Sequence, residues 1–522
     1  MVYLFIFLVS LLKIYAMRKI LSAKQSRELD QMTISAMEIS SYQLMERAVC
    51  ALFEHVGHIF GNLAEKRFVV VSGTGNNGGD GLGLARKLKE ANADVEVWMC
   101  DFSQNISQEC QINLDKLKDL KINIVSLANS DLSTLSFDDN AIIVDAIFGT
   151  GLSRSVTGDC AKVIEAINKA NCTIVSIDIP SGLFADDNSG NEGAIVKANV
   201  TLSIQDYHLS AMFAEYSGYY GKVVIVDIGH DTKSLSSFDT EYCYIEKSDI
   251  VKLIKPRRDF DHKGTFGHAL LVAGGIGKAG AAIMASRACM RTGVGLLTVH
   301  VPMEISSIMQ VAVPEAMLDI DKDNAQGNRN IDCEKYSAVG IGPGIGVGSR
   351  AESKVGTVIA CGKPMVMDAD ALNVLAADAS KLSAITNCIM TPHPKEFERL
   401  FGKMNSMLEK LKFMSEFSRS HKSVIVLKGG VTAISLTDGR IVMYNGRNPG
   451  IATGGSGDVL TGVVTSLLAQ GYGIDDAAII GAWLHGEAGK LATSRFGAMS
   501  TLATDIIDCL PEVCRSVEKT MF

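Results

Sequence analysis

Short runs of apolar, often β-branched residues alternate with helical segments along most of the chain. The run 67–73 is followed by a glycine-rich turn, a helical segment at 81–91 and a second apolar run at 95–100. Strand, turn, helix and strand in this order form the βαβ unit of a parallel sheet, and its crossover is right-handed. The alternation therefore predicts an α/β fold.

The alternation occupies two separate stretches. The first continues, after one or two helices at 22–60, through 141–151, 161–170, 173–182, 200–204 and 222–229; the second covers 268–275, 279–292, 295–302, 338–344, 364–370, 389–394, 423–430, 441–446, 457–470 and 483–492. No internal repeat relates them, so we expect two different domains, each with its own site. The predicted division is an N-terminal domain at 17–230, a polar linker at 231–250 and a C-terminal domain at 251–515.

Length, charge and cysteine content limit the class of protein. The chain has 522 residues, enough for two or three domains. With 50 Lys and Arg against 58 Asp and Glu, the net charge is −8 and no basic run is present, so nucleic acid is not an expected partner. The 12 cysteines lack a CxxC pair and zinc-ligand spacing, which argues against a zinc site and a disulfide framework. Such cysteines indicate buried thiols in a reducing compartment, and we expect a cytoplasmic protein.

Residues 1–16 form an almost wholly apolar extension before a second methionine, Met17. The stretch is shorter than the roughly 20 residues that span a membrane, and it lacks the positive start of a signal peptide. Two interpretations remain, a start codon assigned too far upstream and a membrane anchor. We favour the first, and so expect no membrane partner.

The segment GTGNNGGDG at 73–81 lies between an expected buried strand and an expected helix. Glycines there let the backbone approach a phosphate, and a helix N-terminus offers unpaired amides. The segment lacks GxGxxG spacing, and a tight connection is the alternative. Two further strands end in carboxylates, Asp145 and Asp178, at the sheet edge where α/β proteins bind ligands. We therefore expect the three strand ends to form one site.

The polar residues at these strand ends suggest their chemistry. Asn76, Asn77, Asp145 and Ser181 offer oxygen atoms that suit a cation without nitrogen or sulfur ligands. Asp178 is either a general base or an acceptor that orients the ligand. Asp80 either contacts the ligand or stabilises the helix start.

NNGGDG, VDAIFGTGL and DIPSG, with LMERA upstream, resemble the NAD(P)H-hydrate epimerase family over about residues 17–230. We expect a Rossmann-like, doubly wound, three-layer α/β/α domain here. The resemblance implies catalysis by Asp178 and a potassium ion held by Asn77, Asp145 and Ser181. It also implies that the hydrated nucleotide is bound by Asn76, Asn77, Gly78, Gly79, Asp80, Gly149, Thr150, Gly151, Leu152, Ser153, Arg154, Ser155 and Asp178.

The segment 448–471 is the most specific motif of the second half. Its GGSGD directly precedes a small-residue helix, so several backbone amides converge on an anion hole, with Asp458 beside it as a possible base. A glycine-rich loop capped by Asp458 is the alternative, although a cap does not require three glycines and Gly462. LKGGVT predicts a second glycine turn for nucleotide phosphates, with Lys428 supplying charge. His393, between two prolines, is either structural or functional.

GGSGD resembles the ribokinase superfamily, and HKGTFGHALLVAGG, KAGAA, GIGPGIG, TPHPKE and KGGVT resemble its ADP/ATP-dependent NAD(P)H-hydrate dehydratases over about 250–515. A ribokinase-like α/β domain is therefore expected. The resemblance implies that Asp458 is catalytic and that Mg²⁺ accompanies the nucleotide. It further implies that the hydrate contacts Ala281, Gly344, His393 and Asp458, and that ADP or ATP contacts Lys428, Gly429, Gly430, Val431, Thr432 and Gly457.

Two halves that resemble the two enzymes of one repair pathway predict a bifunctional enzyme acting on NADHX and NADPHX, the hydrated forms of NADH and NADPH. The first half would interconvert the R and S epimers at C6, and the second would dehydrate the S epimer at the expense of ADP or ATP. We also expect a homo-oligomer. Two alternatives stay open: the second half as a small-molecule kinase of a vitamin precursor, and the first half as a non-catalytic scaffold.

Overall fold

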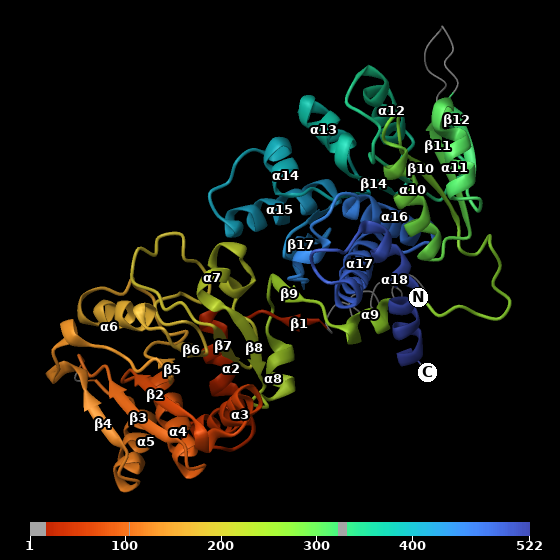
Figure 1. Cartoon of the computed structure of the whole chain (residues 1–522). Helices are drawn as coiled ribbons and strands as arrows, with labels where there is room; N and C mark the ends of the chain where they lie inside the picture. Colours follow the sequence, from red (N-terminus) through yellow and green to blue (C-terminus); the bar gives the residue numbers. More distant parts are fainter. Residues whose placement is uncertain (1–16, 104, 322–330, 522) are drawn as a thin grey trace. The chain divides into compact units, whose positions relative to one another are not determined.

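The computed structural model describes residues 17–103, 105–321 and 331–521 and divides the chain into two compact units. The N-terminal unit comprises Ile20–Thr240, and the C-terminal unit comprises the residues from Glu241 onward together with those that precede Ile20. Each unit is built on its own sheet with helices on both faces (Figure 1). The predicted two-domain α/β architecture is confirmed.

The N-terminal unit contains a seven-stranded parallel sheet in the order β4-β3-β2-β5-β6-β7-β8. Its strands are β2 (Arg67–Ser72), β3 (Asp94–Met99), β4 (Asn123–Ser126), β5 (Ala141–Ala146), β6 (Thr173–Ile177), β7 (Val200–Ile204) and β8 (Lys222–Val226). Its helices are α2 (Ala23–Ala36), α3 (Ser41–Phe60), α4 (Asn76–Glu90), α5 (Gln108–Asp119), α6 (Gly158–Lys169), α7 (Ser217–Tyr220) and α8 (Thr232–Ser237). The strand order reverses between β2 and β5, which is where ligands of doubly wound sheets bind.

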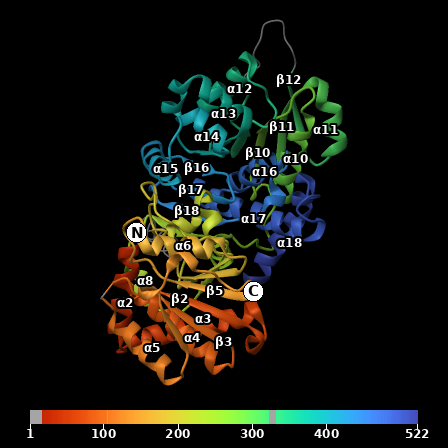
Figure 2. The ribbon, with the colours of Figure 1, turned by 60° about the vertical axis from the view of Figure 1, so that its left-hand side comes forward.

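Alternate residues of β2 explain the three layers of this unit. Phe68 and Val70 pack into the core formed with α3, α4 and α5, whereas Val69 and Val71 pack on the other face, with α6. Figures 1 and 2 both show α6 on the opposite side of the sheet from α3, α4 and α5. A strand buried on both faces is the continuous apolar run that the sequence shows at 67–73.

Helix α4 differs from its prediction at 81–91, because it already begins at Asn76 and includes most of the glycine-rich segment. Its glycines are explained by close packing. A Cβ on Gly79 would lie 2.7 Å from the Met45 side chain, and one on Gly81 would lie 2.5 Å from the Ala146 side chain. The glycines therefore bring the helix close to β5 and α3, in addition to shaping its N-terminus.

The C-terminal unit contains an eleven-stranded sheet in the order β1-β9-β18-β17-β16-β15-β14-β13-β10-β11-β12. Its strands are β1 (Arg18–Lys19), β9 (Tyr242–Tyr244), β10 (His268–Val272), β11 (Leu296–Pro302), β12 (Met317–Asp321), β13 (Ala338–Ile341), β14 (Met365–Met367), β15 (Cys388–Met390), β16 (Val424–Leu427), β17 (Val431–Ser435) and β18 (Ile441–Asn445). Pairing is parallel from β12 to β16 and antiparallel for β16–β17, β17–β18 and β1–β9.

Helices cover both faces of this sheet. They are α9 (Lys247–Leu253), α10 (Ala279–Arg291), α11 (Ser306–Ala312), α12 (Ser349–Ala360), α13 (Ala369–Ala377), α14 (Pro394–Phe401), α15 (Met407–His421), α16 (Ser456–Ala469), α17 (Ile474–Phe496) and α18 (Ala503–Met521). Helices α10, α16, α17 and α18 share one core with alternate strand residues such as Leu271 and Val426. Figures 1 and 2 show α13, α14 and α15 on the other side of the sheet.

The residues around the two unit boundaries belong to regular structure. Residues 231–250, expected as a linker, contain α8, β9 and the start of α9. Arg18 and Lys19 pair with β9, and Met17 is buried in the core of the C-terminal unit. The chain therefore contributes a strand to the C-terminal unit before it forms the N-terminal one.

The prediction for residues 1–16 lies outside the described residues. Within the described ranges, no helix is long and apolar enough to cross a membrane.

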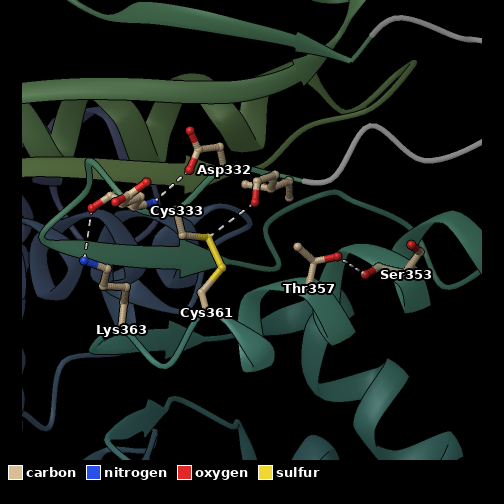
Figure 3. The surroundings of a disulfide bond; sticks show 8 residues. Asp332, Cys333, Ser353, Thr357, Cys361 and Lys363 are labelled. Atoms are coloured by element: carbon tan, nitrogen blue, oxygen red, sulfur yellow. Dashed lines mark hydrogen bonds between the residues drawn. A yellow bond between two sulfur atoms is a disulfide. The ribbon is translucent and has the colours of Figure 1, made fainter.

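The expectation that disulfides are absent is wrong for one pair, Cys333 and Cys361 (Figure 3). Cys333 precedes β13 and Cys361 follows α12, and their Cα atoms lie 6.0 Å apart. The two cysteines are 28 residues apart in sequence, so no short spacing motif indicates the pair. The return of α12 along β13 brings them together. The other cysteines in the described part of the chain are free.

Candidate active sites

The N-terminal site begins at the connection from β2 to α4. Gly73 and Gly78 are required by close backbone approach, because a Cβ on Gly73 would lie 2.1 Å from the Ile147 carbonyl oxygen and one on Gly78 would lie 2.0 Å from the Gly73 carbonyl oxygen. Asn76, the first helical residue, is exposed. The first amides of a helix have no intrahelical acceptor, so this N-terminus can bind an anionic group.

Asn77 is the second residue of α4 and is buried. Neither its Oδ1 nor its Nδ2 atom has a hydrogen-bond partner within the described residues. A Cβ on Gly149 would lie 3.1 Å from both the Cβ atom of Asn77 and the Oδ2 atom of Asp178, so glycine lets the three residues meet. Buried polar atoms are normally paired, and the bare Asn77 amide therefore indicates a ligand position.

Asp145 and Ser181, from the ends of β5 and β6, are joined by a hydrogen bond. The Oδ2 atom of Asp145 accepts from the Ser181 amide at 2.9 Å and from the Ser176 hydroxyl at 2.7 Å. Burial raises the pKa of Asp145, and these hydrogen bonds oppose the rise. The Ser181 hydroxyl in turn accepts from the Phe148 amide at 2.8 Å. The pair thus lies beside the segment that carries Gly149.

Asp178 forms a buried pair with His208. Its Oδ1 atom lies 2.8 Å from Nε2 of His208, and its Oδ2 atom accepts from the Thr150 amide at 3.2 Å. Burial raises the pKa of Asp178, but the charge and hydrogen bond of His208 outweigh it, so the pKa lies below its ordinary value. Burial lowers the pKa of His208, but Asp178 outweighs it and the pKa is raised. Each partner therefore stabilises the charged form of the other.

His208 was not among the predicted site residues. It follows β7, the next strand after β6 in the sheet, at the same carboxyl edge as Asp178. The signal available in the sequence was a histidine four residues after an expected apolar strand at 200–204. Asp178 itself has a backbone φ of 66°, a left-handed conformation that non-glycine residues rarely adopt and that is often found at functional sites.

The other residues predicted to contact the nucleotide in this unit differ in how deeply they are buried. Asp80 is buried, and burial and the charge of Asp178 raise its pKa well above the ordinary value. Of the segment 149–155, Gly149 and Thr150 contact Asp178, whereas Gly151, Ser153 and Arg154 are exposed. The segment therefore extends from the buried pair to the surface.

The C-terminal site is built at the N-terminus of α16. Gly455, with φ 91°, precedes Ser456, the first helical residue, and Asp458 lies in the first turn. A Cβ on Gly457 would lie 3.2 Å from Nζ of Lys428, and one on Gly462 would lie 2.0 Å from the Ala285 carbonyl oxygen. These glycines allow Lys428 to approach the first turn and α10 to pack tightly against α16. The predicted cluster of amides at a helix N-terminus is present.

Asp458 is mostly buried, and its pKa is raised to about 6. Burial is the largest cause, the charge of Asp368 adds to it, and Lys428 opposes it. A carboxylate with a pKa near 6 is suited to general-base catalysis near neutral pH.

Asp368 is a second residue that the sequence analysis missed. It follows β14, and its carboxylate is 1% exposed. Its Oδ1 atom accepts from Nζ of Lys428 at 2.8 Å and its Oδ2 atom from the Thr461 hydroxyl at 2.9 Å. The sequence offered a signal, because Asp368 ends an expected apolar strand at 364–370 as Asp145 and Asp178 end theirs.

The predicted hydrate contacts Ala281 and Gly344 lie together. A Cβ on Gly344 would lie 3.2 Å from the Cβ atom of Ala281, and Gly344 has φ 70°. His393 is the N-cap of α14, where Nδ1 accepts from the amides of Lys395 and Glu396 at 3.1 and 3.3 Å. Its side chain is 46% exposed. His393 thus has a structural role as a cap while its ring remains accessible.

The glycine turn predicted at KGGVT is present, but the sequence did not indicate which strands it joins. Gly429 and Gly430 join β16 to β17, which pair antiparallel, so the turn closes a β-hairpin. Lys428 precedes this turn and reaches α16 through Asp368 and Thr461. The hairpin thus carries Lys428 to the helix N-terminus.

Two α/β units, each with a buried carboxylate beside a glycine-rich helix N-terminus, define a two-site enzyme class. A family model described as YjeF-related protein N-terminus matches residues 41–209, and one described as NAD(P)H-hydrate dehydratase matches residues 269–512. The bifunctional NAD(P)H-hydrate repair enzyme of Moorella thermoacetica is 32% identical over 519 residues, covering 96% of this chain and 97% of the relative. The chain belongs to the family of bifunctional NAD(P)H-hydrate repair enzymes.

A further curated relative agrees with this assignment. The enzyme of the same name from Escherichia coli is 30% identical over 479 residues, covering 91% of this chain and 90% of the relative. Among solved structures, an ADP/ATP-dependent NAD(P)H-hydrate dehydratase from Bacillus subtilis, co-crystallised with ATP and Mg²⁺, is 30% identical with a TM-score of 0.47; it covers 52% of this chain and 97% of that one. Both resemblances found in the sequence are confirmed at the level of the family.

Proposed function

We propose that the protein restores hydrated NADH and NADPH in two steps. The N-terminal unit interconverts the R and S epimers at C6, and the C-terminal unit dehydrates the S epimer at the expense of ADP or ATP. The observation that carries this proposal is that each unit holds its own carboxylate beside a glycine-rich helix N-terminus, the buried Asp178 and the half-buried Asp458.

Epimerisation requires that C6 become planar and then return to either configuration, so the site needs groups that accept and donate protons. Asp178, whose pKa is lowered, can accept a proton or orient the ring, and His208 beside it, whose pKa is raised, can donate a proton when it is charged. The segment 149–155 and the start of α4, from Asn76 to Asp80, would bind the rest of the nucleotide. The Asn76 end of α4 suits the pyrophosphate.

A potassium ion fits the N-terminal site. The bare Oδ1 atom of Asn77, the Asp145 carboxylate and the Ser181 hydroxyl are hard oxygen donors near the same sheet edge. These three residues would hold the ion, and its charge would help to bind the anionic nucleotide. An epimerase rate that is independent of potassium would remove this part of the proposal.

Dehydration has to overcome the poor leaving ability of hydroxide. Asp458 would take the proton of the 6-hydroxyl as the hydroxyl oxygen attacks the terminal phosphoryl group, which releases AMP from ADP or ADP from ATP. Phosphate would then leave C6 with the C6–O bonding electrons while C5 loses a proton to solvent, and the C5–C6 double bond forms. Lys428 to Thr432, with Gly457 and the amides of the first turn, would bind the nucleotide. Ala281, Gly344 and His393 would contact the hydrate.

Mg²⁺ would bind mainly through the phosphates of the nucleotide, where it would neutralise charge. The ion usually keeps several waters and few protein ligands. Asp368 already accepts hydrogen bonds at both oxygens, from Lys428 and Thr461, which supports binding of the ion through phosphate.

We also propose a cytoplasmic homo-oligomer without nucleic-acid or membrane partners. The net charge of −8 supports the lack of nucleic acid, and the exposed apolar Ile308 and Val311 of α11 support contact between copies.

The decisive experiment incubates the purified protein with each hydrate epimer, with and without ADP or ATP, and follows the return of NAD(P)H absorbance. We expect the S epimer to be restored only with nucleotide, and the R epimer to be restored through the S form. Phosphorylation of a hydroxymethyl acceptor, with no restoration of either epimer, would instead identify a small-molecule kinase.

A further inference from the structure

Asp368 is the most completely buried charged group near the C-terminal site, and it lies outside every motif that led to the family. Its carboxylate is 1% exposed, and each oxygen accepts one hydrogen bond, from Lys428 Nζ at 2.8 Å and from Thr461 Oγ1 at 2.9 Å. A buried carboxylate is tolerated only when it is paired and hydrogen-bonded. Lys428 and Thr461 are therefore the partners that compensate the burial of the Asp368 carboxylate.

Three elements converge on this carboxylate. Asp368 follows β14, Lys428 follows β16, and Thr461 lies one turn into α16. Gly457 lies against the ion pair, because a Cβ at this position would lie 3.2 Å from Nζ of Lys428 and 3.4 Å from Oδ2 of Asp368. Thr461 also donates to the Gly457 carbonyl oxygen at 3.2 Å. The ammonium group is thus held at the first turn of α16.

We propose that Asp368 is the positioning residue of the C-terminal site: it anchors the Lys428 ammonium group and, through Thr461, the first turn of α16, so that both face the nucleotide phosphates. This inference rests on the proposed dehydratase activity. A lysine side chain is long and flexible, and an anchor removes conformations that would otherwise be lost on binding. Asp368 acts through Lys428 and is not itself assigned a contact with substrate.

The same carboxylate also influences Asp458. The charged groups that act on Asp458 are Asp368 and Asp370, which raise its pKa, and Lys428, which lowers it. Glu396 lies 4.0 Å from Lys428 on the side of α14. His485 of α17 contacts Ser456 behind the first turn, and burial lowers its pKa to about 4, so it is neutral at working pH. Removing the charge of Asp368 should therefore make Asp458 easier to ionise.

The test is Asp368→Asn in the full chain, which keeps the shape of the side chain and an acceptor for Thr461. We expect the KM for ADP or ATP to rise about tenfold to a hundredfold, the effect of one charge-assisted hydrogen bond, with a smaller change in kcat. We also expect the acid limb of the kcat/KM profile to move to lower pH by on the order of one unit. The matched control, Thr461→Val, removes a hydrogen bond but no charge and should leave the limb in place.

A double-mutant cycle makes the test specific to the Lys428 contact. Asp368→Asn and Lys428→Met should each weaken ADP binding measured by calorimetry, and the double variant should be little worse than either single one. The positioning role would be overturned if the losses of ADP binding in the two single variants added up in the double variant. It would also be overturned if Asp368→Asn, like Thr461→Val, left the acid limb of the kcat/KM profile unmoved.

Two further outcomes keep the test interpretable. If Asp368→Asn does not fold, Lys428→Met tests the same ion pair, because the Lys428 side chain is partly exposed. This variant should move the acid limb of the kcat/KM profile to higher pH, and an unmoved limb would count against the inference. A parent protein that binds ADP but restores neither epimer would contradict the proposed function, while the calorimetric cycle would still decide whether Asp368 positions Lys428.

Discussion

Asp178 in the N-terminal unit, which is buried, and Asp458 in the C-terminal unit, which is half-buried, are both carboxylates beside a helix N-terminus, yet their pKa values shift in opposite directions. Burial raises the pKa in both cases. Asp178 has a direct partner, His208 at 2.8 Å, whose charge outweighs burial. Near Asp458, the cation Lys428 is bonded to Asp368 instead, and the charge of Asp368 adds to the effect of burial.

Since burial raises the pKa of both groups, the opposite directions of their shifts follow from the position of the nearest cation. A lowered pKa of Asp178 and a raised pKa of its neighbour His208 suit reversible proton movement on a ring. An Asp458 with a pKa of about 6 suits a base that must take up a hydroxyl proton near neutral pH. The same residue type thus serves two reactions in one chain.

The largest expected effect is that of Asp178→Ala. It should abolish interconversion of the epimers and leave dehydration of the S epimer intact, because the two carboxylates belong to separate compact units. The measurement is the rate of NAD(P)H recovery from each pure epimer. An equal loss with both epimers would show that the division of labour between the units is wrong.

Asp458→Asn should affect the other unit only. Removal of a general base typically lowers a rate by 10²–10⁴-fold, and we expect a loss of at least hundreds-fold in dehydration with nucleotide affinity largely kept. Single-turnover rates and ADP binding to the same variant separate the two quantities. Unchanged turnover would reduce Asp458 to a helix-capping residue, the alternative that its sequence context left open.

Much of the fold could be predicted because its signals are local. The buried strands appear as apolar runs, and the glycine-rich helix starts at 73–81 and 454–458 appear as motifs. His208 and Asp368 were missed because each becomes informative only when the sheet brings it to a partner distant in sequence, Asp178 or Lys428. The Cys333–Cys361 pair was missed for the same reason.

The raised pKa of Asp458 also predicts an effect on the stability of the C-terminal unit. A buried carboxyl whose pKa is raised from 3.8 to about 6 destabilises the folded state as pH rises through this range, and the cost is complete above pH 6. Asp458→Asn should therefore stabilise the C-terminal unit at pH 7, by up to roughly 3 kcal/mol, and have little effect below pH 4. Thermal unfolding of parent and variant at pH 4 and pH 7 measures this. A variant less stable than the parent at pH 7 would contradict the assigned environment.

The smallest expected effect is a shift in the pH profiles when His208 or Lys428, the neighbours of the two carboxylates, is replaced. With His208→Gln, Asp178 keeps a hydrogen-bond partner but loses the charge that opposes burial, so its pKa should rise and the acid limb of the epimerase profile should move up by roughly one unit or more. Lys428→Ala should move the acid limb of the dehydratase profile in the same direction but by less, because Lys428 is bonded to Asp368 and acts on Asp458 only through its field. Each variant serves as the control for the other reaction. An equal shift in both profiles would mean that direct bonding to the cation is not what distinguishes the two carboxylates.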